Sequence, residues 1–208
     1  MKTRTLLLGA VASFALAGAA NAHGGWYLGI EGGGNWIEDA DALGTIGGVA
    51  TSGTVPTDSG WALIGTVGHE FAKGWRLEGE IGLRENETDS GGYIEVTELS
   101  LMVNVLYDMS ISPSMGLSLG LGAGYDQTTF DFGGVAEADD SDFAWQGIVG
   151  MNWALGDNTD LTVTYRYFNV AGPSLSAGAG IASIDFDDIT KHTVTVGLRF
   201  KMGGGGDK

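Results

Sequence analysis

The chain has 208 residues, enough for one domain, and no cysteine, which excludes a disulfide framework and a metal site built from thiolates. Aspartate and glutamate number 26 against 10 lysines and arginines, so the formal net charge is -16. Such an acidic chain is disfavoured as a nucleic-acid binder, because the phosphates would be repelled.

The N-terminus has the pattern of a secretory signal peptide. Lys2 and Arg4 precede an apolar run over 6–16, and an Ala-Asn-Ala sequence ending at Ala22 supplies the small residues of a cleavage site. The apolar run is too short to make a good spanning helix. We therefore expect residues 1–22 to be removed as a signal peptide, with an uncleaved anchor as the alternative.

Further along the chain, hydrophobic and polar residues alternate with the period of a β-strand. The expected strands are 26–36, 60–71, 75–85, 94–108, 115–126, 142–155, 159–169 and 189–202. The connections between them alternate in length: tight turns lie at 72–74, 109–114 and 156–158, and long loops lie at 37–59, 86–93, 127–141 and 170–188. Short turns on one side and long loops on the other are typical of an outer-membrane barrel.

The two faces of each strand distinguish a membrane barrel from a soluble one. In the last strand Val194, Val196 and Phe200 share one face, whereas Thr195 and Arg199 share the other. A lipocalin-like soluble barrel or a soluble sandwich would have to bury such charges and expose an apolar wall, and both are unfavourable. In a bilayer the apolar face contacts lipid and the charges pair inside.

These patterns predict one fold. No segment after the signal peptide has the roughly 18 consecutive apolar residues of a spanning helix, and an open sheet edge cannot be satisfied by lipid. We predict an all-β protein, an eight-stranded antiparallel up-and-down transmembrane β-barrel over 23–202. Residues 203–208 are then a short Gly-rich periplasmic tail.

Aromatic residues fall mostly near the strand ends, on the apolar face. This is the distribution of the two girdles that lie at the membrane–water interfaces of a barrel. The predicted girdle residues are Trp26, Trp61, Trp75, Tyr107, Tyr125, Trp145, Trp153, Tyr167 and Phe200.

The inward charges predict an ion-pair network in the lumen. Its expected members are Glu31, Glu70, Arg76, Glu78, Glu80, Arg84, Glu98, Gln146, Arg166 and Arg199, with Asn152 beside them. Counting along the strands places Arg84 opposite Glu98, and Glu70 and Arg76 on either side of the first turn. The network either satisfies a polar lumen or acts as a gate, in which an arginine such as Arg166 exchanges carboxylate partners.

Small residues recur at every second position over 116–124, on the inward face of the strand: Gly116, Ser118, Gly120, Gly122 and Gly124. We expect this to leave room for long arginine and glutamate side chains from across the lumen. A dinucleotide-binding loop is excluded because no helix follows the glycines. The sequence contains no other cofactor motif, and we expect no cofactor.

Three segments resemble those of the small outer-membrane β-barrel proteins of Gram-negative bacteria, which include the membrane domain of outer membrane protein A and porin-like surface antigens. They are Trp26–Gly29 after the signal peptide, Thr164–Phe168, and Lys191–Phe200. The resemblance implies an outer-membrane location with extracellular loops and periplasmic termini. It also implies that the last strand is recognised by the barrel-insertion machinery, although Lys201 to Lys208 follow where the family often ends on the aromatic residue.

The four predicted loops contain acidic residues and no lysine or arginine. They form either a solvated surface that resists aggregation or a functional site. That site would bridge the loops to anionic lipopolysaccharide through divalent cations, or attract a basic partner. The acidic run from Glu137 to Asp142 lacks the spacing and the glycine of an EF-hand loop, so no dedicated metal site is predicted.

We expect no enzymatic activity. The alternative is an outer-leaflet lipid-modifying enzyme built on His192 with Ser183 and either Asp187 or Asp188, but no nucleophile motif surrounds that serine. The favoured function is a structural or surface-interaction barrel. A narrow ion or small-solute porin is the second hypothesis, limited because eight strands leave no wide lumen.

Overall fold

The structure is a computed structural model of the full chain. It describes residues 25–38, 40–46, 49–55, 59–88, 94–132, 137–171, 174–177, 182–186 and 188–202. The predicted signal peptide and the Gly-rich tail lie outside the described residues. Among the described residues, no helix is long and apolar enough to cross a membrane.

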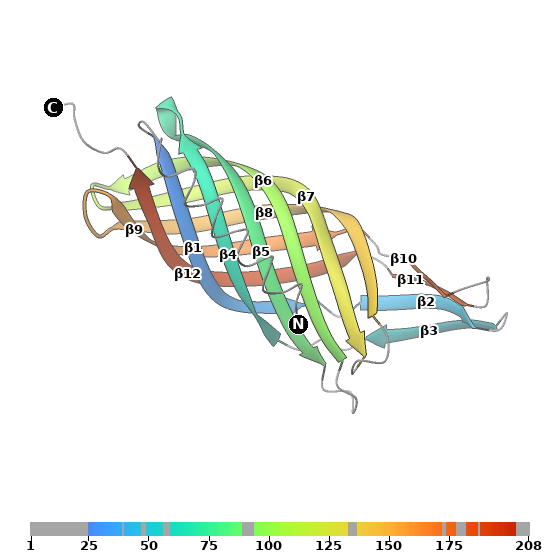
Figure 1. Ribbon diagram of the computed structural model, residues 1–208. Helices are drawn as coiled ribbons and strands as arrows, with labels where there is room; N and C mark the ends of the chain where they lie inside the picture. The colour runs from blue at the N-terminus through green and yellow to red at the C-terminus, as the bar shows by residue number, and fades with distance from the viewer. Residues whose placement is uncertain are drawn as a thin grey trace.

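Eight strands close into a barrel in which every neighbouring pair is antiparallel (Figure 1). They are β1 (Trp26–Ile37), β4 (Ser59–Glu70), β5 (Trp75–Thr88), β6 (Ile94–Ser112), β7 (Met115–Phe132), β8 (Glu137–Ala154), β9 (Thr159–Val170) and β12 (Ile189–Met202). The barrel closes where β1 pairs with β12, so each of its eight strands is paired on both sides. The predicted fold is confirmed.

The two ends of the barrel differ in the length of the connections between strands: one is the turn end and the other is the loop end. At the turn end, short links join β4 to β5, β6 to β7 and β8 to β9, and the barrel strands begin at Trp26 and end at Met202. The first link contains the 3-10 helix η1 (Ala72–Gly74), where Lys73 and Gly74 both have a positive φ, 68° and 82°. The opposite end is the loop end.

The loop end contains more strand than the sequence predicts. β2 (Ala40–Ile46), β3 (Val49–Val55), β10 (Ser174–Ala177) and β11 (Ala182–Phe186) form a second sheet in the order β10-β11-β2-β3, which extends from the barrel (Figure 1). The prediction that 37–59 and 170–188 are loops without strands was therefore wrong. So was the loop at 127–141, because β7 and β8 extend into it. Small and polar residues hide the alternation in these segments, and strand pairing satisfies their backbone groups.

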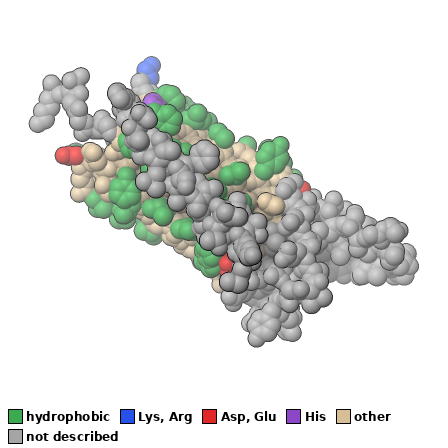
Figure 2. Space-filling model, viewed as in Figure 1, with side chains coloured by type: hydrophobic (Ala, Val, Ile, Leu, Met, Phe, Trp, Pro, Cys, Tyr) green, Lys and Arg blue, Asp and Glu red, His purple; other side chains and the backbone are tan. Residues whose placement is uncertain are grey.

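The wall of the barrel is apolar outside and polar inside, as predicted. In β12, Val196 is 52% exposed, whereas Thr195 is fully buried and Arg199 is 6% exposed. Figure 2 shows hydrophobic side chains over the middle of the barrel wall, with charged side chains towards its ends. The alternation follows from the pleat, which points successive side chains to opposite faces. Hydrocarbon is the medium that such a wall fits.

Candidate functional site: the polar lumen

The lumen is filled by charged and amide side chains, most of them buried, arranged in three layers. The carboxylates are Glu31, Glu70, Glu78, Glu80, Glu98, Asp108, Asp126 and Asp160, and the basic residues are Arg76, Arg84, Arg166, Lys191, Arg199 and Lys201. Because buried charges are stable only when they are paired and hydrogen-bonded, the pairing decides what the lumen can do.

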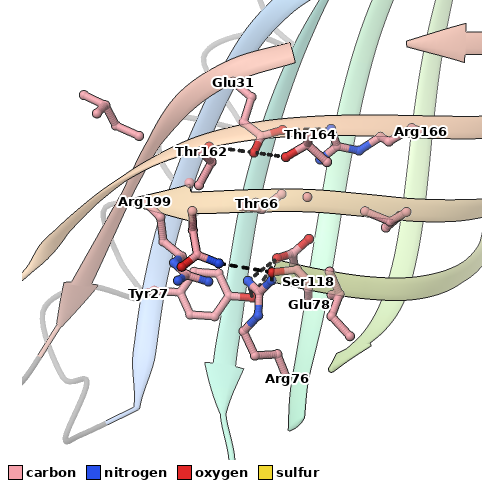
Figure 3. A pocket seen from close by; sticks show the side chains of 16 residues that line it. Tyr27, Glu31, Thr66, Arg76, Glu78, Ser118, Thr162, Thr164, Arg166 and Arg199 are labelled. Carbon is pink, nitrogen blue, oxygen red and sulfur yellow. Dashed lines mark hydrogen bonds and ion pairs between the residues drawn. The ribbon is translucent and has the colours of Figure 1, made fainter. Parts of the chain in front are cut away.

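The middle layer is centred on Arg166 of β9. Its Nη1 lies 2.7 Å from Oε2 of Glu31, and its Nε lies 3.3 Å from Oε2 of Glu80. Arg166 therefore bridges two carboxylates from β1 and β5. Thr162 and Thr164 each donate a hydrogen bond to Glu31, at 2.9 and 3.0 Å (Figure 3). Thr195 donates a third, at 2.8 Å.

The amides Asn104 and Gln146 complete the middle layer. The Gln146 amide donates to Oε1 of Glu80 at 3.1 Å, and the Asn104 amide donates to Oε2 of Glu80 at 2.9 Å. Asn104 also donates to Glu78 at 3.3 Å, which joins this layer to the turn-end layer. The carboxylates are thus held by both cations and neutral donors, so the network has few free positions for rearrangement.

The turn-end layer contains Arg76 and Arg199. Arg76 lies 2.8 Å from Asp108. It also donates to the Tyr27 hydroxyl at 3.1 Å, and that hydroxyl donates to Glu78 at 2.6 Å (Figure 3). Arg199 binds Asp160 through Nη2 at 2.6 Å and Nε at 3.0 Å. Lys201 shares Asp160 at 2.9 Å, and Glu70 lies 3.8 Å from Arg199.

The loop-end layer contains Lys191 and Arg84. Nζ of Lys191 lies 2.7 Å from Glu98 and 3.1 Å from Asp126, and all three side chains are at most 4% exposed. Arg84 donates to Ser100 at 2.8 Å and stacks on Phe168, 4.3 Å from the ring centroid. Among the described residues, the other guanidinium nitrogens of Arg84, Nε and Nη2, have no hydrogen-bond partner.

Little open space remains between the layers. A cavity of ≈ 40 Å³ lies among residues of the middle and turn-end layers, including Glu31, Arg76, Arg166 and Arg199 (Figure 3). That volume has room for about three water molecules. The described part of the lumen is therefore packed by side chains, as expected for an eight-stranded barrel.

Every residue of the predicted network lies on the inward side of the barrel. Several of them, however, form ion pairs with other residues than those that counting along the strands predicted. Arg84 lies opposite Glu98 in the β5–β6 register, yet Glu98 pairs with Lys191. Glu70 lies opposite Arg76, yet Arg76 binds Asp108 and Glu78 instead. Strand counting fixes neighbours in the sheet, whereas long side chains reach across the lumen.

The predicted network omitted several residues that the structure brings into it. They are Tyr27, Asn104, Asp108, Asp126, Asp160, Lys191 and Lys201. Lys191 has the same place as Arg199 in the alternation of the strand predicted over 189–202, so its inward direction was already readable from the sequence. Asp126 was assigned to the border of a loop, because the prediction ended β7 too early.

The inward glycines of β7 make room for different side chains from those predicted. A Cβ at Gly116 would lie 2.8 Å from the Asn152 amide oxygen, and a Cβ at Gly122 would overlap Oδ1 of Asn104 and lie 3.0 Å from Gln146. The occupants are therefore amides from neighbouring strands. Arginines and glutamates from across the lumen were the wrong expectation at these two positions.

The predicted girdle residues lie on the outer wall. Trp26, Trp61, Trp75, Tyr107, Tyr125, Trp145 and Phe200 are between 39% and 66% exposed, and Trp153 and Tyr167 are half-buried. Trp36, Phe71 and Phe143 are exposed on the same wall and extend the set. Neighbouring rings pack together, such as Trp75 with Tyr107 at 5.1 Å and Trp145 with Tyr167 at 5.5 Å.

His192 lies on the outer wall towards the loop end. Its Nδ1 lies 2.7 Å from the Tyr165 hydroxyl, and its Nε2 lies 2.8 Å from the Glu38 carboxylate. Both ring nitrogens are thus engaged by Tyr165 and Glu38. The side chain of Ser183 and residue Asp187 lie outside the described part of the chain, so the suggested grouping with His192 stays a prediction. Among the described residues, no group of three or more His, Cys, Asp or Glu side chains is arranged to hold a metal ion.

Comparison with known proteins places this barrel in a family. The model of the outer membrane protein beta-barrel domain matches residues 5–201. No curated protein sequence matches the chain.

Solved structures share the fold at low sequence identity. Neisserial surface protein A aligns with a TM-score of 0.58 and 14% identity, over 87% of this chain and 99% of that one. OprG from Pseudomonas aeruginosa aligns with a TM-score of 0.55 and 19% identity, over 86% and 98%. The outer membrane protease OmpT from Escherichia coli aligns with a TM-score of 0.50 and 8% identity, over 86% and 97%.

At these identities the likeness shows the fold alone, and the same fold occurs in a surface protein and in a protease. The family match covers nearly the whole chain and agrees with the closed barrel and its apolar wall. The chain belongs to the outer membrane protein beta-barrel domain family and is an outer-membrane β-barrel protein.

Proposed function

We propose that this protein is a structural barrel of the outer membrane that presents acidic loops for surface interactions and does not conduct solutes through its lumen. The observation that supports this is the packed lumen: paired charges occupy it, and the cavity between the middle and turn-end layers is ≈ 40 Å³. Ions need a continuous polar path, and these side chains occupy it.

Single-channel recording in planar bilayers tests this proposal. We expect wild-type protein to give no unitary steps, because the bridge from Arg166 to Glu31 and Glu80 fills the middle of the lumen. A porin added to the same bilayer provides the positive control. Steady conductance of the wild type would contradict the structural proposal.

The second candidate function is a narrow, gated ion path. It is favoured by the shared position of Arg166 between two carboxylates, and by the excess of carboxylates over basic residues in the lumen, which would favour cations. If the gate exists, Arg166→Ala raises the open probability and Glu80→Ala alters it. Indistinguishable traces from the wild type and both variants would eliminate this candidate.

We further propose that the loop end faces the exterior and that the turn end and both termini face the periplasm. Short turns on the periplasmic side and long connections outside are the pattern of bacterial barrels. The acidic loops would then contact the surroundings directly or approach lipopolysaccharide through divalent cations, and the barrel-insertion machinery would recognise β12.

Cysteine labelling on intact cells tests the orientation, since the chain contains no cysteine to give background. We expect Ser59→Cys, exposed at the loop end, to react with a maleimide that cannot cross the membrane. Asn158→Cys, exposed at the turn end, is the matched control and should react only after the outer membrane is permeabilised. The reverse pattern would show that the barrel is inserted the other way.

A further inference from the structure

The outer wall of the barrel carries a groove of ≈ 570 Å³ that runs from β5 to β9. Trp75 and Tyr107 line it near the turn end, Leu121 lies in the middle, and Tyr165 and Tyr167 line it towards the loop end. Its volume lies in the range of small-molecule sites, about 300–1,000 Å³. The groove lies on the apolar outer wall of the barrel.

One missing side chain opens this groove. In the strand register, Gly147 of β8 lies between Leu121 of β7 and Tyr167 of β9. Gly147 belongs to the outward face, because its neighbours Gln146 and Ile148 are buried. A Cβ added at Gly147 would have no heavy atom within 4 Å. The larger side chains of Leu121 and Tyr167 therefore lie on either side of a depression at Gly147.

The groove ends at a polar chain of hydrogen bonds. The Tyr165 hydroxyl lies 2.7 Å from Nδ1 of His192, and Nε2 of His192 lies 2.8 Å from Oε1 of Glu38. A carboxylate only accepts, so Nε2 carries the ring proton, and in the neutral ring Nδ1 accepts from Tyr165. Tyr165 and Tyr167 also pack against the His192 ring, with centroids 6.0 and 5.6 Å away.

The negative charge of Glu38, at the loop end of the groove, decides which polar groups a ligand could place there. The Glu38 side chain is 59% exposed and therefore accessible to a ligand. In the sequence, the segments 37–59 and 170–188 contain further carboxylates and no lysine or arginine. A phosphate would be repelled here, whereas a hydroxyl or ammonium group can donate to the carboxylate.

We propose that this groove binds one acyl chain of a membrane amphiphile whose head group carries hydroxyl or amino donors and no phosphate. The apolar length next to Gly147 takes the chain, and Glu38 with His192 receives the head group. An amphiphile matches both features, since it is apolar along its length and polar at one end. A second copy of the barrel would match only the apolar part.

Native mass spectrometry of the folded protein in detergent tests the site with three probes that share a tetradecyl-length chain: monomyristoylglycerol, tetradecylamine and tetradecyl phosphate. We expect wild-type protein to retain one molecule of each of the first two, and to bind the phosphate at least about tenfold more weakly. Gly147→Phe should weaken binding of all probes by about tenfold or more, because the ring fills the groove.

Two further variants make the test specific. Gly65→Phe is the matched control, because Gly65 is also an outward glycine in the wall but does not line the groove. It should bind like the wild type, and circular dichroism should show that both phenylalanine variants are folded. Glu38→Gln should bring the affinity for tetradecyl phosphate to within about threefold of that for tetradecylamine, because the repelling charge is removed.

Equal binding by Gly147→Phe and Gly65→Phe would overturn the proposal, and so would a wild type that binds the phosphate probe as tightly as the amine. A wild-type dimer that Gly147→Phe dissociates, without any bound probe, would overturn it in favour of a contact between two copies. None of these outcomes depends on conductance, so this inference and the proposed function can fail separately.

Discussion

Replacing Lys191 with methionine is expected to lower the free energy of unfolding of the barrel by about 3–5 kcal/mol. The substitution keeps a side chain of similar length but leaves Glu98 and Asp126 as neighbouring buried carboxylates without their shared cation. Removing one partner of a buried ion pair is costly because the remaining charge stays desolvated. Urea titration of the protein refolded in lipid vesicles measures the change.

Two further variants test whether a loss of stability in Lys191→Met comes from the two carboxylates left without a cation. Adding Glu98→Gln and Asp126→Asn to Lys191→Met should recover most of the lost stability, because no uncompensated charge then remains. Lys201→Met is the matched control on the same face of β12. Its side chain is 33% exposed, and Arg199 still binds Asp160, so a loss of at most about 1 kcal/mol is expected. A similar loss in both single variants would mean that the Lys191 ion pairs are not what stabilises the loop-end layer.

Replacing Arg166 with methionine is expected to cost about 3–5 kcal/mol as well, because Glu31 and Glu80 lose their common partner in the middle layer. Arg166→Lys should lie between the wild type and Arg166→Met, since an ammonium keeps the charge but cannot reproduce the fork that reaches both carboxylates. The same urea titration measures both variants.

An exposed cation provides the comparison for Arg166. Lys73→Gln, in the turn between β4 and β5, should change stability by less than about 0.5 kcal/mol, as is usual for surface positions. If Arg166→Met were as harmless as Lys73→Gln, the ion pairs of the middle layer would contribute nothing to stability, and their role would have to be sought in conduction alone.

The last strand shows how far sequence reasoning reaches. The alternation predicted an outer face with Val194 and Val196. It predicted an inner face with Thr195 and Arg199, and the structure has the same two faces. This works because the pleat imposes a period of two on any strand, whatever its partners. The same rule predicted the inward direction of Arg166.

The contacts of those inward residues were not predictable in the same way. Glu98 lies opposite Arg84 in the sheet but binds Lys191, which comes from a strand that is not its neighbour. The groove at Gly147 and the contact of His192 with Glu38 also depend on which residues of adjacent strands lie side by side. The strands within the connecting segments 37–59 and 170–188 were also not predicted. These strands show little hydrophobic alternation, and they form by pairing with one another.

The sequence by itself determined the number of barrel strands, the face of each strand that meets lipid and the polar character of the lumen, because these follow from local alternation along one chain. Only the tertiary structure decided which charges pair, how little space they leave and where the outer wall is hollow. Closing the barrel sets the register and brings distant strands face to face across the lumen, and side-chain pairing depends on those distances in space.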